Sequence, residues 1–198
     1  LFADYEQRFL KRNVQGAFRI AEGQQPRIKG RRILPRLFRQ RFGAARTRIW
    51  LTTPYFVPSE PLSLALIAAA RRGVKVILVI PARVDSKLVR FASGAFKGDM
   101  LRAGVRIMLF HDGLLHTKSI TIDGAVALFG TANLDIRSLS LNFELMLAIY
   151  DATFAAELLA LQLGYERDSF PVVLREWRER PVSARLLEGI ASMAAPLL

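Results

Sequence analysis

The hydrophobic positions along residues 46–110 repeat a rhythm of strand and helix. Continuous apolar runs predict buried strands at RIWLTT, VKVILVIP and VRIMLF. Between them, apolar residues at helical spacing predict helices over 59–72 and about 87–103, which end before Gly73 and Gly104. Because parallel strands need long crossovers, this part of the chain is typical of a parallel sheet covered by helices.

The pattern changes after residue 110, where two short alternating segments follow one another. These segments, LHTKSITI and AVALF, are separated by Asp123-Gly124, a pair typical of a tight hairpin turn. FELMLAIY then predicts another strand, residues 151–169 predict a helix, and the tail predicts one or two amphipathic helices interrupted at Pro181. The whole pattern predicts an α/β fold in which a mixed, α+β-like sheet is flanked by helices.

The first part of the chain does not continue this rhythm. Residues 1–13 predict a short helix, residues 22–32 are rich in turn formers and charge, and a basic amphipathic helix is expected from Ile33 onward. We therefore divide the chain into a basic N-terminal segment, residues 1–45, and a globular domain, residues 46–198.

Composition and charge narrow the possible partners. The chain has 198 residues, 52% of them hydrophobic, and no cysteine, so one sizeable core is expected and disulfides and thiolate metal sites are excluded. Residues 1–50 hold 13 Lys and Arg against 3 Asp and Glu, so most of the net charge of +12 lies there. Such a block suits a phospholipid surface or a nucleic-acid backbone, although a solvated basic face has a similar composition. No apolar run reaches the ~18 residues of a membrane-spanning helix.

Polar residues that suit a phosphate group gather around the hairpin. His116 and Lys118 are two residues apart on a predicted strand, so they share one face at a spacing of ~7 Å. The hairpin returns the second strand beside them, ending in Gly130-Thr131-Ala132-Asn133. In this arrangement Lys118 would neutralise charge, Thr131 and Asn133 would donate hydrogen bonds, and Gly130 would allow close backbone approach.

A histidine in this setting can act as a nucleophile. Neutral imidazole can attack phosphorus, and the phosphoramidate that forms is labile enough for its phosphoryl group to be passed on. A lone histidine on a strand more often has a structural role, but the neighbouring lysine and Gly-Thr-x-Asn turn favour the catalytic interpretation. We expect no metal or other cofactor, because the chain has two histidines and no clustered carboxylates.

The spacing of these residues resembles the HKD motif of the phospholipase D superfamily. The shared pattern is HxK, four residues, Asp, six residues and then G-[ST]-x-N. It is formed here by His116, Lys118, Asp123, Gly130, Thr131 and Asn133. Threonine stands where serine is commoner in the superfamily; it keeps the hydroxyl and is similar to the synthase branch.

Further segments narrow the resemblance. TPYFVPSEPL, AARRGVKVILVIP, GLLHTKS and GTANLDIRSLSLNFE are similar to the C-terminal half of bacterial cardiolipin synthases, over roughly residues 47–198. The resemblance implies a phospholipase D-like fold that is one half of the usual two-lobed enzyme. It also implies that Glu144 accepts a hydrogen bond from the other ring nitrogen of His116, which would fix the tautomer and stabilise the imidazolium. Asp123, at the hairpin turn, is assigned a structural, charge-pairing role.

Residues outside the motif receive simpler interpretations. We expect His111 to be a surface or rim residue, because it lies in a loop before the motif. Asp135 and Arg137 are expected to form an ion pair that supports the loop after Asn133. The apolar tail at 186–198 suits membrane contact and core packing equally.

The resemblance implies a phosphatidyltransferase that makes cardiolipin from two phosphatidylglycerol molecules and releases glycerol, through a phosphohistidine intermediate. One imidazole bonded to phosphorus cannot also protonate the leaving alcohol, so a second HKD motif is needed. We expect that motif to come from an N-terminal half missing from this chain or from a homodimer partner. Which histidine is the nucleophile and which is the acid–base group stays open.

The implied partners are phosphatidylglycerol, other anionic phospholipids and an anionic membrane surface. The implied location is the bacterial inner membrane, where this chain would be peripheral on the cytoplasmic face and any transmembrane anchor would lie upstream. Two alternatives stay open. A homodimeric HKD nuclease would place the basic block on nucleic acid, and an anionic-lipid-binding half-domain would be inactive by itself.

Overall fold

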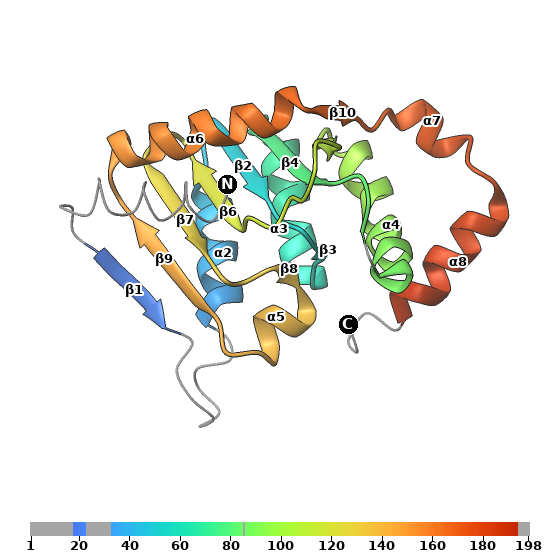
Figure 1. Ribbon diagram of the computed structural model, residues 1–198, viewed down its shortest axis with the longest axis horizontal. Helices are drawn as coiled ribbons and strands as arrows, with labels where there is room; N and C mark the ends of the chain where they lie inside the picture. The colour runs from blue at the N-terminus through green and yellow to red at the C-terminus, as the bar shows by residue number, and fades with distance from the viewer. Residues whose placement is uncertain (1–17, 23–32, 85, 194–198) are drawn as a thin grey trace.

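The computed structural model describes residues 18–22, 33–84 and 86–193, which form a large mixed sheet flanked by helices (Figure 1). The strands are β1 Phe18–Glu22, β2 Arg48–Thr52, β3 Phe56–Val57, β4 Lys75–Pro81, β5 Arg106–Phe110, β6 Ser119–Ile122, β7 Val126–Gly130, β8 Leu134–Asp135, β9 Leu145–Ile149 and β10 Ser169–Pro171. The helices are α2 Ile33–Ala44, α3 Glu60–Arg71, α4 Lys87–Arg102, α5 Ile136–Ser140, α6 Ala152–Arg167, α7 Leu174–Arg178 and α8 Val182–Met193. The eight-stranded sheet has the order β1-β9-β7-β6-β2-β4-β5-β10, and β3 and β8 form a separate parallel pair.

Only the centre of the large sheet is parallel. Strands β2, β4 and β5 run in one direction and are linked by crossovers through α3 and α4, as the strand–helix rhythm predicts. All the other neighbouring pairs in this sheet are antiparallel. The predicted mixed α/β sheet is therefore confirmed, with an antiparallel share that comes from the hairpin and from strands added at both sides.

Helices cover both faces of the sheet, and alternating side chains fill both layers. Ile49 and Leu51 of β2 belong to the layer that contains α2 and α3, whereas Trp50 packs toward Tyr165 of α6. All four side chains are buried. Figure 1 shows α6 along one face of the sheet and α2 and α3 behind the other. The double coverage explains why the central strands are continuous apolar runs.

Helix α2 lies before the predicted domain boundary, but it packs into the main core. Leu34, Phe38 and Phe42 repeat along one side and are at most 5% exposed. The rings of Phe38 and Phe42 are stacked with centroids 6.0 Å apart, while Arg36 and Arg39 are exposed. The predicted amphipathic helix is thus present, and its apolar face belongs to the same folded unit as the following strands.

Strand β1 also comes from the basic N-terminal segment. It pairs antiparallel with β9, so that Phe18 lies opposite Ile149. The sequence pattern does not predict this strand, because the segment carries no clear strand alternation. The helix predicted over 1–13 lies outside the described residues, as do residues 23–32 of the predicted loop.

The Asp-Gly turn connects β6 and β7 as predicted. Asp123 and Gly124 both have positive φ, 53° and 68°, and the Ala125 N–H donates to the Ile122 carbonyl at 3.1 Å. Such a turn matches the twist of the paired strands. The register that it sets brings the residues before β6 beside the end of β7.

A buried polar network holds α6 on this hairpin. The Gln162 side chain donates to the Ser119 carbonyl at 3.2 Å and to its hydroxyl at 3.0 Å, and it accepts from the Thr121 hydroxyl at 2.7 Å. Because an unpaired amide is costly in such a layer, these bonds favour one position of α6 along the strand. Strand β6, which follows His116 and Lys118, is therefore held in place by packing and hydrogen bonds from α6.

The C-terminal helices α7 and α8 form an arm that packs on α4 (Figure 1). The predicted break at Pro181 lies between them. Glu188 of α8 is 8% exposed, forms an ion pair with Arg180, and lies against Gly94 of α4, where an added Cβ would clash with its carboxyl group. Glycine at this position leaves room for the Glu188 carboxyl group where it stands, and a larger residue would make that side chain move.

The apolar tail after residue 186 divides between packing and surface. Ala191 is buried, whereas Leu186 and Ile190 are 64% and 59% exposed. Residues 194–198 lie outside the described part of the chain. Among the described helices, none combines the length and the apolar character needed to cross a bilayer.

Candidate active site

His116 and Lys118 meet directly in front of β6. The Lys118 ammonium nitrogen lies 3.0 Å from His116 Nδ1 and 3.2 Å from Nε2, and it donates to the His116 carbonyl at 2.7 Å. Both residues precede the strand rather than lie in it, but the alternation holds, since Thr117 between them is buried and His116 is exposed. The predicted convergence of these two side chains is confirmed.

Gly130 brings the end of β7 to the same place. Its N–H donates to the Lys118 carbonyl at 3.2 Å. A Cβ at this position would lie 2.0 Å from the Leu145 carbonyl oxygen. Gly130 was predicted to allow a close backbone approach. In the structure it is strand β9 that approaches, which packs the sheet tightly. Close approach of a phosphate to Gly130 stays a prediction.

Thr131 connects this strand end to Glu144. Its hydroxyl donates to Glu144 Oε2 at 2.5 Å and accepts the Leu145 N–H at 2.9 Å. Since a hydroxyl has one hydrogen, that hydrogen is already used by the carboxylate. Thr131 thus positions Glu144 in the structure, and its predicted hydrogen bond to a phosphate is not tested.

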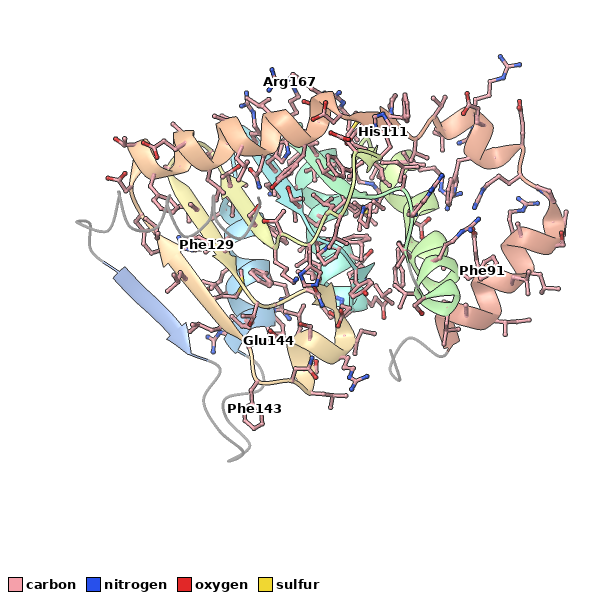
Figure 2. The ribbon with its side chains drawn as sticks, viewed as in Figure 1. Phe91, His111, Phe129, Phe143, Glu144 and Arg167 are labelled. Carbon is pink, nitrogen blue, oxygen red and sulfur yellow. The ribbon has the colours of Figure 1, made fainter. Side chains whose placement is uncertain are left out.

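Glu144 is held by three side-chain donors. Besides Thr131, the Ser138 hydroxyl donates to Oε1 at 2.6 Å and the Asn142 amide donates to the same oxygen at 3.3 Å. The side chain is half-buried and lies close to α5 (Figure 2). A carboxylate held in this way can orient and stabilise a neighbouring imidazolium. Its predicted hydrogen bond with His116 stays a prediction.

Ser138 is a site residue that the sequence analysis missed. Its hydroxyl accepts the Asn133 N–H at 2.9 Å and donates to Glu144, so it links the motif asparagine to the carboxylate. The signal for its position was present, because Asp135 and Ser138 have the spacing of a helix N-cap. The Asp135 carboxylate accepts the Ser138 N–H at 2.6 Å and starts α5.

The expected Asp135–Arg137 ion pair is wrong. Asp135 is buried, and its carboxylate accepts hydrogen bonds from the Ser138 N–H, as the N-cap of α5, and from the Asn133 side chain. Arg137 is exposed. Burial raises the pKa of Asp135, against these hydrogen bonds and the charge of Arg137. Among the described residues, Arg137 has no carboxylate within ion-pair distance.

Asp123 has the predicted structural role but different partners. Its carboxylate accepts the N–H groups of Arg46, Thr47 and Arg48 at 2.8–2.9 Å, and also the Thr47 hydroxyl at 2.9 Å. Burial acts to raise the pKa of Asp123, but these donors outweigh it and hold the pKa below the ordinary value. The expected charge pairing is therefore replaced by hydrogen bonds to neutral backbone donors at the start of β2.

His111 lies apart from this cluster. It is exposed, its ring lies 4.3 Å from that of Phe170, and Nδ1 is 2.5 Å from the Asp168 carbonyl oxygen. In the view of Figure 2 it lies near the upper edge of the molecule, whereas Glu144 lies in the lower half. The prediction that His111 is a surface residue is confirmed.

No group of three or more His, Asp or Glu side chains suited to a metal occurs among the described residues.

Comparison with known proteins agrees with this geometry. The family model described as "Cardiolipin synthase, PLD-like domain" matches residues 38–161. The chain belongs to this family. One curated member, cardiolipin synthase A of Proteus mirabilis (strain HI4320), is 47% identical over 155 residues, which cover 78% of this chain and 32% of that protein. The chain thus spans about a third of the length of the curated relatives it matches.

Solved structures show that the PLD-like domain has the expected fold. Nuc from Salmonella typhimurium, described as a phospholipase D family member, superposes with a TM-score of 0.62 at 21% identity, over 70% of this chain and 90% of Nuc. The phosphatidylserine synthase of Haemophilus influenzae Rd KW20 gives 0.61 at 19% identity, over 83% of this chain and 45% of that one. The phospholipase D-like fold implied by the HKD motif is confirmed.

Proposed function

We propose that this chain supplies one catalytic half-site of a cardiolipin synthase, which transfers a phosphatidyl group between two phosphatidylglycerol molecules and releases glycerol. The observation that supports this most directly is the contact of the Lys118 ammonium with the His116 ring at 3.0 Å. An ammonium beside an imidazole is suited to an anionic phosphodiester. The 47% identical relative, which is named cardiolipin synthase A, supports a phospholipid substrate.

In the proposed reaction, one imidazole nitrogen attacks phosphorus and the P–O bond to glycerol breaks. The departing glycerol takes a proton from a second group, and a phosphatidyl-histidine is left. A hydroxyl of the next phosphatidylglycerol then attacks phosphorus and gives its proton to that second group, while the P–N bond breaks. Lys118 would stabilise the phosphoryl oxygens in both steps, and Glu144 would stabilise a cationic His116.

His116 can be the nucleophile or the acid–base group, but it cannot do both in one step. The proposal therefore requires a second HKD half, contributed by an N-terminal half or by a homodimer partner. About two thirds of the length of the matched relative lies outside the region shared with this chain. A protein of that length has enough additional sequence to contain an N-terminal half with a second HKD motif.

We place the enzyme on the cytoplasmic face of the bacterial inner membrane, with this chain at the surface of the bilayer. Arg36 and Arg39 are exposed on α2 while its opposite side packs in the core. Each basic side chain near an anionic bilayer contributes about 1 kcal/mol of attraction. This supports binding to phosphatidylglycerol-rich membranes.

The test compares two histidine variants of the whole protein that contains this chain. His116→Ala should lower conversion of phosphatidylglycerol to cardiolipin by at least ~10³-fold, because it removes the nucleophile or its acid–base partner. His111→Ala, on the surface away from the motif, should keep full activity. Full activity of the His116 variant with an unchanged melting temperature would overturn the assignment.

A nuclease is the second candidate, favoured by the net charge of +12. Assaying the same protein on phosphatidylglycerol vesicles and on plasmid DNA separates the two. DNA cleavage that depends on His116, without lipid transfer, would replace our proposal with a nuclease. Lipid binding without turnover on either substrate, measured with both halves present, would instead indicate an inactive lipid-binding domain.

A further inference from the structure

A pocket of about 370 Å³ adjoins the motif asparagine and is not used by the mechanism above. Its wall combines three segments: the loop after β2 with Tyr55, the start of α4 with Ser86 and Val89, and the turn from Asn133 to Asn142. This volume is within the usual range for small-molecule sites. Asn133 belongs to both the pocket and the HKD motif, so the pocket borders a residue that is predicted to bind the phosphate.

Arg137 provides the exposed charge of this pocket. It lies in the first turn of α5, and no carboxylate among the described residues is within ion-pair distance of it. Asp135 also lines the pocket, but it is 8% exposed and its oxygens are engaged by the Ser138 N–H and the Asn133 side chain. Of the two charged side chains that line the pocket, the exposed one is therefore the Arg137 guanidinium, which attracts anions and repels cations.

The other polar groups offer hydrogen bonds of both kinds. The Ser86 oxygen accepts the Val89 N–H at 3.3 Å, which leaves its hydroxyl hydrogen available to a ligand. The Asn142 amide nitrogen donates to Glu144, which leaves its carbonyl oxygen as an acceptor. The backbone N–H of Asn142 donates to the Arg137 carbonyl at 3.0 Å. Asn142 therefore contacts both Arg137 of the pocket and the Glu144 carboxylate.

These groups match a neutral polyol that is joined to a phosphate. Arg137 suits phosphate oxygens, and the Ser86 hydroxyl and the Asn142 oxygen suit alcohol groups. Val89 adds an apolar side chain that suits the carbon skeleton. A head group that carries an ammonium would place a second cation near Arg137 and would be disfavoured by repulsion and desolvation.

We propose that this pocket binds the glycerol head group of a phosphatidylglycerol substrate and that Arg137 selects it against ethanolamine and choline head groups. This inference rests on the proposed lipid transfer, because it identifies the head-group subsite of the same centre. Arg137 is then a specificity-determining residue, distinct from the groups that react with phosphorus.

The first test measures selectivity in the whole protein. Wild type, Arg137→Gln and Arg137→Lys are assayed for phosphatidyl transfer from phosphatidylglycerol and from phosphatidylethanolamine in vesicles of fixed composition. The Gln variant should raise KM for phosphatidylglycerol about 10-fold and lower the preference over phosphatidylethanolamine at least 10-fold, whereas Lys should keep most of the preference. An unchanged preference in a folded Gln variant would overturn the inference.

Arg71→Gln is the matched control. Arg71 is exposed at the far end of α3, whose 12 residues span about 18 Å from the loop that lines the pocket. This variant should behave as wild type. A change of preference equal to that of Arg137→Gln would show that general surface charge is responsible, and would also overturn the inference.

The second test does not depend on turnover. Binding of glycerol 3-phosphate and of phosphoethanolamine to the whole protein is followed by thermal shift, with Arg137→Gln and with Ser86→Ala. Glycerol 3-phosphate should raise Tm more than phosphoethanolamine does, and both variants should reduce the difference. Equal shifts for the two compounds would overturn the pocket assignment even if His116→Ala confirms transfer; a selective shift without transfer would preserve the pocket and overturn the proposed function.

Discussion

The Thr131 hydroxyl donates a hydrogen bond to the Glu144 carboxylate across 2.5 Å while it accepts the N–H of Leu145. Thr131, at the serine or threonine position of the motif, thus helps to hold the Glu144 carboxylate in place. Its hydroxyl cannot rotate freely, because the neighbouring strand supplies a fixed donor. Glu144 is accordingly oriented before any substrate arrives, which is how a positioned charge acts most effectively.

Removing this hydroxyl should impair catalysis more than folding. Thr131→Val keeps the shape of the side chain but loses both hydrogen bonds, so we expect a 10- to 100-fold lower kcat, the usual effect of losing a supporting hydrogen bond. Thr131→Ser should stay within about 3-fold of wild type, because it keeps the hydroxyl. Steady-state phosphatidyl transfer by the whole protein measures both. Wild-type kcat in the Val variant would show that Glu144 needs no such support.

Asp123 should make the stability of the chain sensitive to acid. Its folded pKa lies below the ordinary 3.8, so its stabilisation is complete above that pH and is lost as the pH falls through the folded pKa. Asp123→Asn should cost about 1–2 kcal/mol at pH 7, because the backbone donors of residues 46–48 lose a charged acceptor. Urea unfolding at several pH values measures this. The difference between the two proteins should shrink below pH 3.8, and a constant difference would contradict the role given to the carboxylate.

Gly130 should tolerate no side chain. An alanine Cβ would lie 2.0 Å from the Leu145 carbonyl oxygen, a backbone atom that cannot move without shifting β9. We expect Gly130→Ala to cost about 3 kcal/mol or more. Gly43→Ala is the control, because nothing lies within 4 Å of a Cβ added there, near the end of α2. It should be neutral or stabilising by about 0.5–1 kcal/mol in denaturant unfolding; equal effects at both positions would refute the packing argument.

Lys97 should make stability rise with pH in the alkaline range. Burial under the C-terminal arm lowers its pKa from 10.5 to about 8, against the attraction of Glu188 and with repulsion from Arg180 and Arg90. The unfolded chain therefore holds a proton that the folded chain has lost between pH 8 and 10.5, so the free energy of unfolding increases across that range by about 2 kcal/mol.

Substitution of Lys97 separates this contribution from other titrations. Lys97→Met should remove the increase, and Lys75→Met, at an exposed position at the start of β4, should keep it. Thermal or urea unfolding at pH 7.5 and pH 10 measures each protein. A rise of the same size in all three would show that Lys97 is not its source.

Local signals in the sequence predicted the elements that they directly encode. The Asp-Gly pair fixed the hairpin because both residues can adopt positive φ, as they do at 53° and 68°. The two-residue alternation placed His116 and Lys118 on one side even though they lie before the strand itself. The alternation therefore predicted the contact between His116 and Lys118, and the hairpin predicted that Gly130 lies beside Lys118.

Long-range partners had no comparable signal. Asp123 binds three backbone N–H groups more than seventy residues away, and backbone donors are the same whatever the side chain. Ser138 reaches Glu144 only because α5 turns the chain back after Asn133. The sequence could suggest that such residues are structural or polar, but it could not identify their partners.

Strand β1 covers an edge of the sheet that would otherwise be open to pairing with another molecule. Its five residues occupy the hydrogen-bonding positions beside Leu145–Ile149 of β9, the strand that directly follows Glu144. A version shortened to begin at residue 33 would leave that row of N–H and C=O groups open, ready to recruit a strand from another molecule. Trimming the basic segment to improve solubility should therefore cause self-association that begins next to Glu144.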